Sequence, residues 1–293
     1  MKNFLKQLFI FLLVILAINT LLFVVTRNIY YSEYEKVELH HETYLLADSR
    51  GEALGSYSDK YSIHNFSDGS DSYKDLYRKL TFLINNTKIK KVYLTADEHG
   101  IAKYRESKNN EDRSIYFLNL EVRNTELIPL SYLEFFENKY LRKYIIFFNA
   151  KAKDLLIAYF KNFVKSSKKE KQEWHLFENE KQEKQAVARF ERQFNEETQS
   201  EEMLQYLRKI ISTCKDNQVE LVGIKFPVVD AYLKKINDLE NKKIDSVLLN
   251  HDIIIIDLRE EFNNKPDLFK NQDHLNDKGA VLFIDRLDKE LFQ

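Results

Sequence analysis

The first apolar segment of the chain is also its longest. Residues 8–25 read LFIFLLVILAINTLLFVV, and only the pair Asn19 and Thr20 interrupts the run. A stretch of this length that is apolar on all sides can cross a bilayer as a helix, and it has no polar face of the kind a buried core helix would keep. Lys2 and Lys6 precede it, which predicts a cytoplasmic N-terminus and an exported body. A cleaved signal peptide fits less well, because its apolar region is shorter and no A-x-A-like site follows here.

Beyond this anchor (residues 1–27) and a polar stalk (residues 28–42), short apolar runs alternate with amphipathic segments. The apolar runs predict five strands, at residues 43–48, 61–67, 90–97, 219–226 and 252–258. Helical spacing predicts helices at residues 72–86, 201–217, 231–249 and 276–292. Alternating strands and helices indicate a parallel sheet covered on both faces. We therefore expect one three-layer α/β/α domain over residues 43–293.

Residues 101–200 break this alternation. The segment 133–164 is apolar and helical in pattern, whereas 165–194 is rich in charge. We expect the whole block to be a helical insertion between the third and fourth strands, folded back on the edge of the sheet where ligands bind. Its charged part is typical of a solvated helix face, and its aromatic part is equally suited to cover a substrate groove.

Composition excludes several classes of function. Net charge is −1 with both signs spread along the chain, so no basic field favours nucleic acid. Cys214 is the only cysteine, which rules out an intramolecular disulfide and a thiolate metal cluster. His40 and His41 are neighbours in sequence and should not share a face, so no metal pair is expected there. The chain should need neither a metal nor an organic cofactor.

Two polar segments lie where a parallel sheet places its chemistry, beyond the carboxyl ends of strands. The first, LLADSRG (45–51), puts Ser49 directly after the first strand. The second, NQDHLNDKGA (271–280), puts His274 after the last strand and before the last helix. A neutral imidazole there can take the proton of a serine hydroxyl and return it to a leaving group. Taken singly, Ser49 is ordinary turn material and His274 an ordinary loop histidine.

Taken together, the two segments resemble the SGNH (GDSL-like) hydrolase family. The segment ADSRG is similar to its Gly-Asp-Ser block, with Ala47 in the glycine position, and DHLNDKGA is similar to its closing block. The resemblance covers residues 43–100 and 201–292. It implies a flavodoxin-like fold and ester chemistry, with Ser49 as nucleophile and His274 as base. The family places an Asp three residues before this His, and here that residue is Asn271.

This departure leaves the third catalytic group open. An amide orients an imidazole but does not stabilise an imidazolium as a carboxylate does. Asp273, adjacent to His274, is a candidate acid with an unfavourable position in sequence. The chain could also work as a Ser–His dyad, recruit another acid, or be a catalytically impaired relative.

The resemblance also implies donors to an oxyanion. They are the Ser49 N–H, a Gly after the second strand and an Asn after the third. Gly69 suits the second role, although it could equally be a structural turn glycine. The expected Asn is missing. The segment after the third strand contains Asp97 and His99 instead. We take these two residues and Arg50 as candidates for contacts with the oxyanion or the substrate. His99 could equally be a loop residue without such a role.

The sequence thus predicts an extracytoplasmic, single-pass membrane protein, of bacterial type, that acts as a serine esterase or O-acyltransferase. The resemblance implies acyl, chiefly acetyl, esters of cell-envelope polysaccharide as substrates and a membrane acyltransferase as partner. Membrane lipid is expected to hold the N-terminal helix. Two alternatives stay open. One is an SGNH-fold protein that binds or assembles glycans without catalysis, and the other is a membrane-tethered scaffold acting through residues 133–194.

Overall fold

The computed structural model describes residues 1–118, 133, 136–164, 174–194, 199–239 and 243–291. The described chain divides into two compact units, which are treated separately. The first unit comprises Met1–Lys36 with Asp112–Glu170, and the second comprises Val37–Glu111 with Lys171–Gln293. The block expected as one insertion over residues 101–200 is therefore divided. Its middle part groups with the N-terminal helix, and its two ends group with the sheet.

The second unit contains a five-stranded parallel sheet in the order β2-β1-β3-β4-β5. This is the flavodoxin-like order 2-1-3-4-5, and the predicted fold class is confirmed. Each strand falls within a range predicted from the sequence: β1 Thr43–Leu46, β2 Ile63–Asn65, β3 Lys91–Thr95, β4 Glu220–Lys225 and β5 Ile255–Asp257. Because all five are parallel, their carboxyl ends meet at one edge, and β1 brings Ser49 to that edge.

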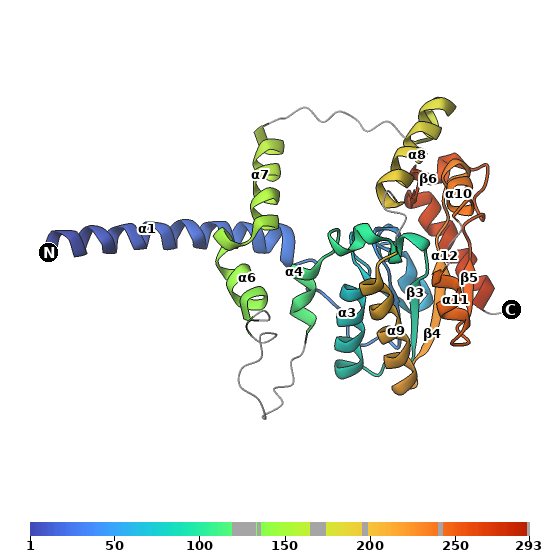
Figure 1. Ribbon diagram of the computed structural model, residues 1–293, viewed down its shortest axis with the longest axis horizontal. Coiled ribbons are helices and arrows are strands. Elements are labelled where there is room, and N and C mark those ends of the chain that lie inside the picture. Colours follow the sequence, from blue (N-terminus) through green and yellow to red (C-terminus); the bar gives the residue numbers. More distant parts are fainter. Residues whose placement is uncertain (119–132, 134–135, 165–173, 195–198, 240–242, 292–293) are drawn as a thin grey trace. The chain divides into compact units, whose positions relative to one another are not determined.

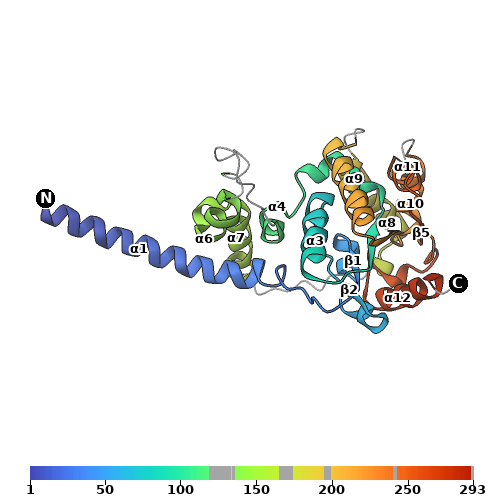
Figure 2. The same ribbon diagram turned by 90° about the horizontal axis from the view of Figure 1, so that it is seen from below.

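Helices cover both faces of this sheet, with α3 and α9 side by side on one face (Figure 2). Ser72 and Asp75 form a capping box at the start of α3, which explains why the helix begins where it does. The opposite face is closed by an apolar cluster in which Leu45 and Ile224 of the sheet pack with Phe283 of α12. The principal helices are α3 Tyr73–Asn86, α8 Asn179–Phe194, α9 Glu201–Asp216, α10 Asp230–Asn237, α11 Lys243–Leu249 and α12 Asp277–Leu291.

The prediction of one helix over residues 231–249 is wrong in one respect. The segment forms two helices, α10 and α11, with residues 240–242 between them outside the described part of the chain. Short elements complete this unit: α2 Ser49–Glu52, η2 Tyr57–Tyr61, η3 Glu98–Ile101, η4 Lys103–Glu106, η8 Trp174–Leu176, η9 Pro266–Leu268, β6 Phe269–Asn271 and β7 His274–Leu275.

The first unit is built on α1, Lys2–Thr26, which continues without a break into η1, Arg27–Tyr31 (Figure 1). The expected stalk at residues 28–42 therefore begins as helix. The apolar segment predicted to be helical is so where described, but it is broken at Ile145 and Asn149. Around α1 lie α4 Glu111–Ser114, η5 Ile115–Phe117, η6 Glu137–Leu141, α6 Arg142–Tyr144, η7 Ile146–Phe148 and α7 Ala150–Val164.

Candidate active site

A tight turn after β1 presents Ser49. Asp48 caps the following helical turn, and its Oδ1 accepts a hydrogen bond from the Arg50 backbone N–H at 3.1 Å. A side chain at Gly51 would place Cβ 2.5 Å from Ser67 Oγ and 2.6 Å from Ala47 Cβ, so only glycine fits this close approach. The Asp48 carboxylate thus stabilises the turn by capping it, and Gly51 allows its close approach to Ala47 and Ser67. Ser49 itself stays half-buried, with its hydroxyl at the carboxyl edge of the sheet.

His274 reaches the same edge from the other end of the chain. It lies at the start of β7, which pairs antiparallel with β6 so that Asn271 stands opposite His274. The His274 Nε2 atom lies 2.8 Å from Ser49 Oγ. This is within the range expected for a nucleophile and its base. The two residues are 225 positions apart in sequence: Ser49 follows β1 of the parallel sheet, and His274 belongs to the separate β6–β7 pair.

The other ring nitrogen of His274 contacts two acceptors. Nδ1 lies 2.9 Å from Asn271 Oδ1 and 3.0 Å from Asp273 Oδ1. An Nδ1–H can donate to both, which leaves Nε2 free to accept the serine proton. Asp273 therefore occupies the position of the acid although it is adjacent to the histidine in sequence.

Two arginines fix the Asp273 carboxylate, which is fully buried. Arg189 Nε donates to its Oδ2 at 2.8 Å, and Arg50 Nη2 lies 3.7 Å from the same oxygen. Burial alone would raise the pKa of Asp273, but the hydrogen bond with His274 and the charges of His274, Arg50 and Arg189 hold that pKa well below its usual range. The carboxylate is thus charged at any pH where the imidazole could work.

The three candidates for oxyanion or substrate contacts form a buried layer beneath Ser49. Arg50, Asp97 and His99 are each at most 2% exposed, and none of them lines the cavity beside Ser49. Arg50 Nη1 lies 2.9 Å from Asp97 Oδ1. His99 Nε2 lies 2.6 Å from Asp48 Oδ2, and Arg105 also pairs with Asp48. In this structure the three residues hold the Ser49 turn from below instead of facing the cavity.

Burial governs the ionisation of this layer. It raises the pKa of Asp97 to about 6, and it lowers the pKa of His99, together with the positive charge of Arg50, to about 3. His99 is therefore a neutral imidazole that donates to the Asp48 carboxylate. A neutral donor is what the site requires here, because Arg50 and Arg105 already supply positive charge.

The low pKa of His99 predicts a pH-dependent stability. As pH falls below about 6.5, His99 becomes protonated in the unfolded chain. In the folded chain it stays neutral down to about pH 3. Protonation therefore favours the unfolded state in this range, and the free energy of unfolding drops. His99→Gln keeps a donor for Asp48 but cannot titrate. The stability of the variant relative to the unchanged protein should rise as pH is lowered from 7 to 4, by up to about 1.4 kcal/mol per pH unit.

Chemical denaturation at a series of pH values measures this difference. The raised pKa of Asp97 acts in the opposite direction, stabilising the folded chain at lower pH, but Asp97 is present in both proteins and cancels from the comparison. A difference that stays constant between pH 7 and 4 would contradict the assignment of His99 as a buried neutral group.

Gly69 lies close to Ser49. A Cβ built on it would stand 3.9 Å from Ser49 Cβ and 2.7 Å from Glu52 Oε2, so its backbone is next to the nucleophile. The Asn110 Nδ2 group donates to the Gly69 carbonyl and to Asp71 Oδ1, each at 2.7 Å. Asn110 thus fixes the Gly69 loop. The Ser49 and Gly69 N–H groups stay the predicted oxyanion donors.

A cavity of about 560 Å³ opens beside Ser49 and His274. No described residue of the 101–200 block lines it, so the expected covering groove is not formed there. Its wall is mostly polar and carries charges of both signs. The lining residues are Ser49, Glu52, Ala53, Gly55, Ser56, Tyr57, Lys270, Asn271, His274 and Asp277.

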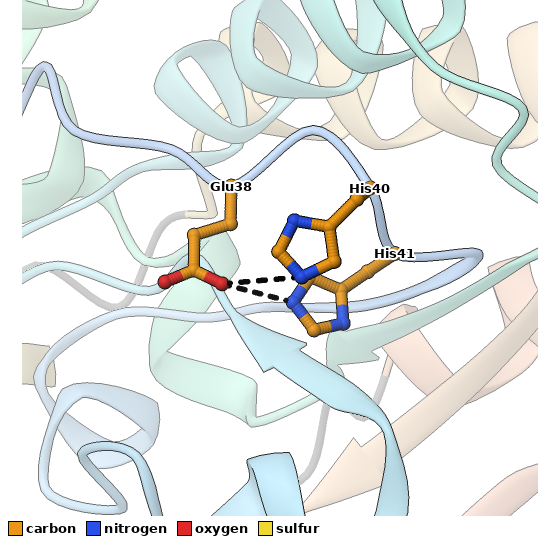
Figure 3. A group of neighbouring side chains, drawn as sticks. All are labelled: Glu38, His40 and His41. Carbon is orange, nitrogen blue, oxygen red and sulfur yellow. Dashed lines mark hydrogen bonds and ion pairs between the residues drawn. The ribbon is translucent and has the colours of Figure 1, made fainter.

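Before the amino end of β1, the side chains of two histidines contact one carboxylate (Figure 3). The Nε2 atoms of His40 and His41 lie 3.5 and 3.1 Å from Glu38 Oε2. The expectation that these neighbours would diverge is wrong, because the chain turns before β1 and stacks the His41 ring on that of His64. Metal ligands can be this close, but so can an ion pair, and Glu38 and His40 are exposed. The cluster precedes the amino end of β1, whereas Ser49 follows its carboxyl end.

No protein-family model matches the chain, and no curated protein matches it in sequence. Solved structures do match. A GDSL-like lipase from Bacteroides thetaiotaomicron VPI-5482 is 8% identical, with a TM-score of 0.45 over 92% of this chain and 98% of that one. The psychrotrophic esterase EstA from Pseudoalteromonas sp. is 12% identical, with a TM-score of 0.40 over 86% of this chain and 100% of that one. With such low scores, the assignment of a function depends on the geometry of this chain's own site.

Proposed function

We propose that the protein is a membrane-anchored serine esterase or O-acyltransferase that acts on short acyl esters of hydrophilic glycans. The observation that carries the proposal is the continuous line of contacts from Ser49 Oγ to His274 Nε2 (2.8 Å) and from His274 Nδ1 to Asp273 Oδ1 (3.0 Å). A nucleophile, a base and an orienting carboxylate in this order are the arrangement that activates a serine hydroxyl.

The reaction follows from this arrangement. Ser49 Oγ attacks the acyl carbon while His274 Nε2 takes its proton, and Asp273 stabilises the resulting imidazolium. Negative charge develops on the acyl oxygen, and the Ser49 and Gly69 N–H groups are the donors proposed to stabilise it. The tetrahedral intermediate then expels the alcohol, which takes the proton from His274, and leaves an acyl-enzyme on Ser49. Attack by water completes hydrolysis, and attack by a sugar hydroxyl completes transfer.

The cavity wall supports a polar substrate. Glu52, Lys270 and Asp277 place charges within reach of the nucleophile, and the apolar lining is limited to small residues and the ring of Tyr57. Hydroxyl groups of a sugar would find hydrogen-bond partners on such a wall, whereas a long acyl chain would lie against charged side chains. Tyr57 is 40% exposed and offers an apolar face to a sugar ring. Acetylated envelope polysaccharide is the substrate class that this wall favours.

The N-terminal helix supports a position of this chemistry at a membrane. The helix from Lys2 to Tyr31 is long and apolar enough to span a bilayer, a property that signal sequences share. Basic residues at its start favour a cytoplasmic N-terminus, so the sheet domain would lie outside the cytoplasmic membrane, where acylated glycans are exposed. A membrane acyltransferase that supplies the acyl group is the partner we propose for the transfer reaction.

Substrate length tests the proposal. The full-length protein in detergent should release p-nitrophenol from p-nitrophenyl acetate with a kcat/KM at least about tenfold higher than from the octanoate ester, because the cavity lacks an apolar channel. It should also release acetate from an O-acetylated oligosaccharide. Ser49→Ala is the matched control for background hydrolysis. Equal or faster turnover of the octanoate ester would contradict the assignment to short acyl esters of glycans. If no ester is turned over, the proposal that the protein is an enzyme is wrong.

A further inference from the structure

Two polar side chains, Asn19 and Thr20, interrupt the apolar stretch of the anchor helix; the Thr20 hydroxyl donates to the Leu16 carbonyl of the same helix, whereas Asn19 bonds to another segment. Asn19 Nδ2 donates to the Tyr144 carbonyl at 2.8 Å, and Asn19 Oδ1 accepts from the Ile146 N–H at 3.1 Å. Both backbone groups belong to the break between α6 and α7, where Ile145 leaves the helical conformation. The amide of Asn19 and the broken helix therefore satisfy each other's hydrogen bonds within the first unit.

Apolar packing surrounds this polar contact. Ile146, Ala152 and Leu156 are buried against Leu22, Phe23 and Val25 of α1. Asn149 caps α7 by accepting from the Ala152 N–H at 2.9 Å, and its Nδ2 donates to the Tyr31 hydroxyl at 2.6 Å. The start of α7 is thus joined to the last part of the anchor helix by specific contacts.

The depth of the break follows from helix geometry. Asn19 stands seven residues before Thr26, the last residue of α1, which at 1.5 Å per residue is about 10 Å. If α1 spans a bilayer with its apolar run, Asn19 lies inside the hydrocarbon region on the outer side. The break at residues 144–146, bonded to Asn19, then lies at the same depth.

The side chains around the break suit such an environment. Phe147 and Phe148 are 44% and 65% exposed, and Tyr144 is 48% exposed. Seven further large apolar side chains in the same segment are also exposed: Leu133, Phe136, Tyr140, Leu141, Leu155, Ile157 and Tyr159. A patch of this kind marks an interaction site. Tyr is enriched at the interface between hydrocarbon and headgroups, and Phe and Leu form the apolar face of helices that lie in it.

Helix direction agrees with an interfacial position. In Figure 1 α7 runs steeply across the axis of α1, and in Figure 2 it is seen nearly end-on beside the same part of α1. If α1 lies close to the membrane normal, α7 therefore runs nearly parallel to the membrane plane, as interfacial helices do. The segment 136–164 also holds six basic residues against two acidic ones, which suits an anionic headgroup layer.

We propose that the segment 136–164 is a second membrane element, a broken helix that lies in the outer leaflet beside the anchor with Phe147 and Phe148 in the hydrocarbon. This rests on the anchor of the proposed function. The bilayer is the occupant that the structure favours, because the exposed apolar side chains belong to a segment that packs directly against α1, whose own apolar side chains are exposed. The sheet domain would then be joined to the membrane through both 1–36 and 112–170, rather than through one helix and a stalk.

A spin label measures the depth of this segment in the full-length protein. Cys214 is buried and is the only cysteine, so Cys214→Ala gives a background for single labels. In vesicles of phosphatidylcholine and phosphatidylglycerol, a label at Phe148→Cys should collide with oxygen more than with a water-soluble nickel chelate. A label at Lys161→Cys, on an exposed polar position of α7, should show the opposite preference. The ratio of the two collision rates should differ severalfold between the sites.

The outcomes separate the two proposals. If the protein resists alkaline extraction but the label at 148 collides freely with the nickel chelate, the anchor stands and the second membrane element is wrong. A label at 148 shielded from both relaxants would show protein contact, such as a second copy of the chain, and would equally overturn the inference. Complete alkaline extraction would refute the anchor and the segment together. Phe147→Cys repeats the measurement if the first variant does not fold.

Discussion

Replacing Ser49 with Ala, or His274 with Ala, is expected to lower kcat for an acetyl ester by about 10⁴- to 10⁶-fold. The reason is the 2.8 Å contact between Ser49 Oγ and His274 Nε2, through which each residue works only with the other. The double variant should therefore be hardly slower than either single one. Steady-state hydrolysis by the three purified variants measures this, with thermal unfolding as the check that each is folded.

Two results would contradict this expectation. Independent, multiplicative losses in the double variant would mean that the two side chains do not act as a unit. Activity that survives Ser49→Ala would mean that another nucleophile does the work. Loss of the Ser49 hydroxyl should affect folding little, because the backbone of Ser49 and not its hydroxyl forms the α2 turn. The effect on turnover is therefore separable from any effect on stability.

The fold was readable from the sequence because its signals are local. Each strand is a short apolar run, and each helix has a clear face, so alternation alone implied a parallel sheet. The positions of Ser49 and His274 followed from the same logic, since ligand edges lie at the carboxyl ends of strands. The helix predicted at 231–249 failed because periodicity continues across a break that has no proline or glycine to mark it.

The site beyond Ser49 and His274 was less readable, because it is assembled from segments distant in sequence. Arg189 comes from α8, in a charged run that looked like a solvated helix face, and yet its Nε donates to Asp273. Asn110 comes from the other end of the same block and holds the Gly69 loop. Nothing local in a charged or polar run separates such residues from their solvated neighbours. A buried position is set only by the packing of the whole domain.

The acid illustrates the same limit. A residue adjacent to its histidine is an unusual partner, so the sequence pointed to Asn271 and left Asp273 doubtful. In the structure, the antiparallel pairing of β6 with β7 brings Asn271 opposite His274, while the Asp273 side chain turns inward to Arg189. One ring nitrogen thereby meets an amide and a carboxylate at once. The amide fixes the ring, and the carboxylate supplies the charge.

This division of labour predicts unequal effects of the two residues. Asp273→Asn should lower kcat by about 10²- to 10⁴-fold, because the imidazolium that forms during the reaction loses its counter-charge. The loss should not exceed about 10⁴-fold, because Asn271 Oδ1 lies 2.9 Å from His274 Nδ1 and still accepts a hydrogen bond from it. This contact preserves the tautomer of the imidazole. Asn271→Ala should cost far less, about tenfold at most, because Asp273 stays in place. Asn271→Asp alone should bring no gain, because it adds a second negative charge beside Asp273.

The decisive variant exchanges the two, with Asn271→Asp and Asp273→Asn combined. It moves the carboxylate to the position that the SGNH resemblance implies, where an oxygen would still lie near His274 Nδ1. We expect it to recover a large part of the activity that Asp273→Asn loses, although Arg189 and Arg50 then face a neutral amide in a buried site and stability should fall. Turnover and thermal unfolding measured on the same samples distinguish the two effects. If the exchange recovers nothing while the protein remains folded, the carboxylate works only from position 273. If Asp273→Asn itself leaves kcat unchanged, Asp273 serves only to pair the arginines, and the Ser49–His274 pair works as a dyad.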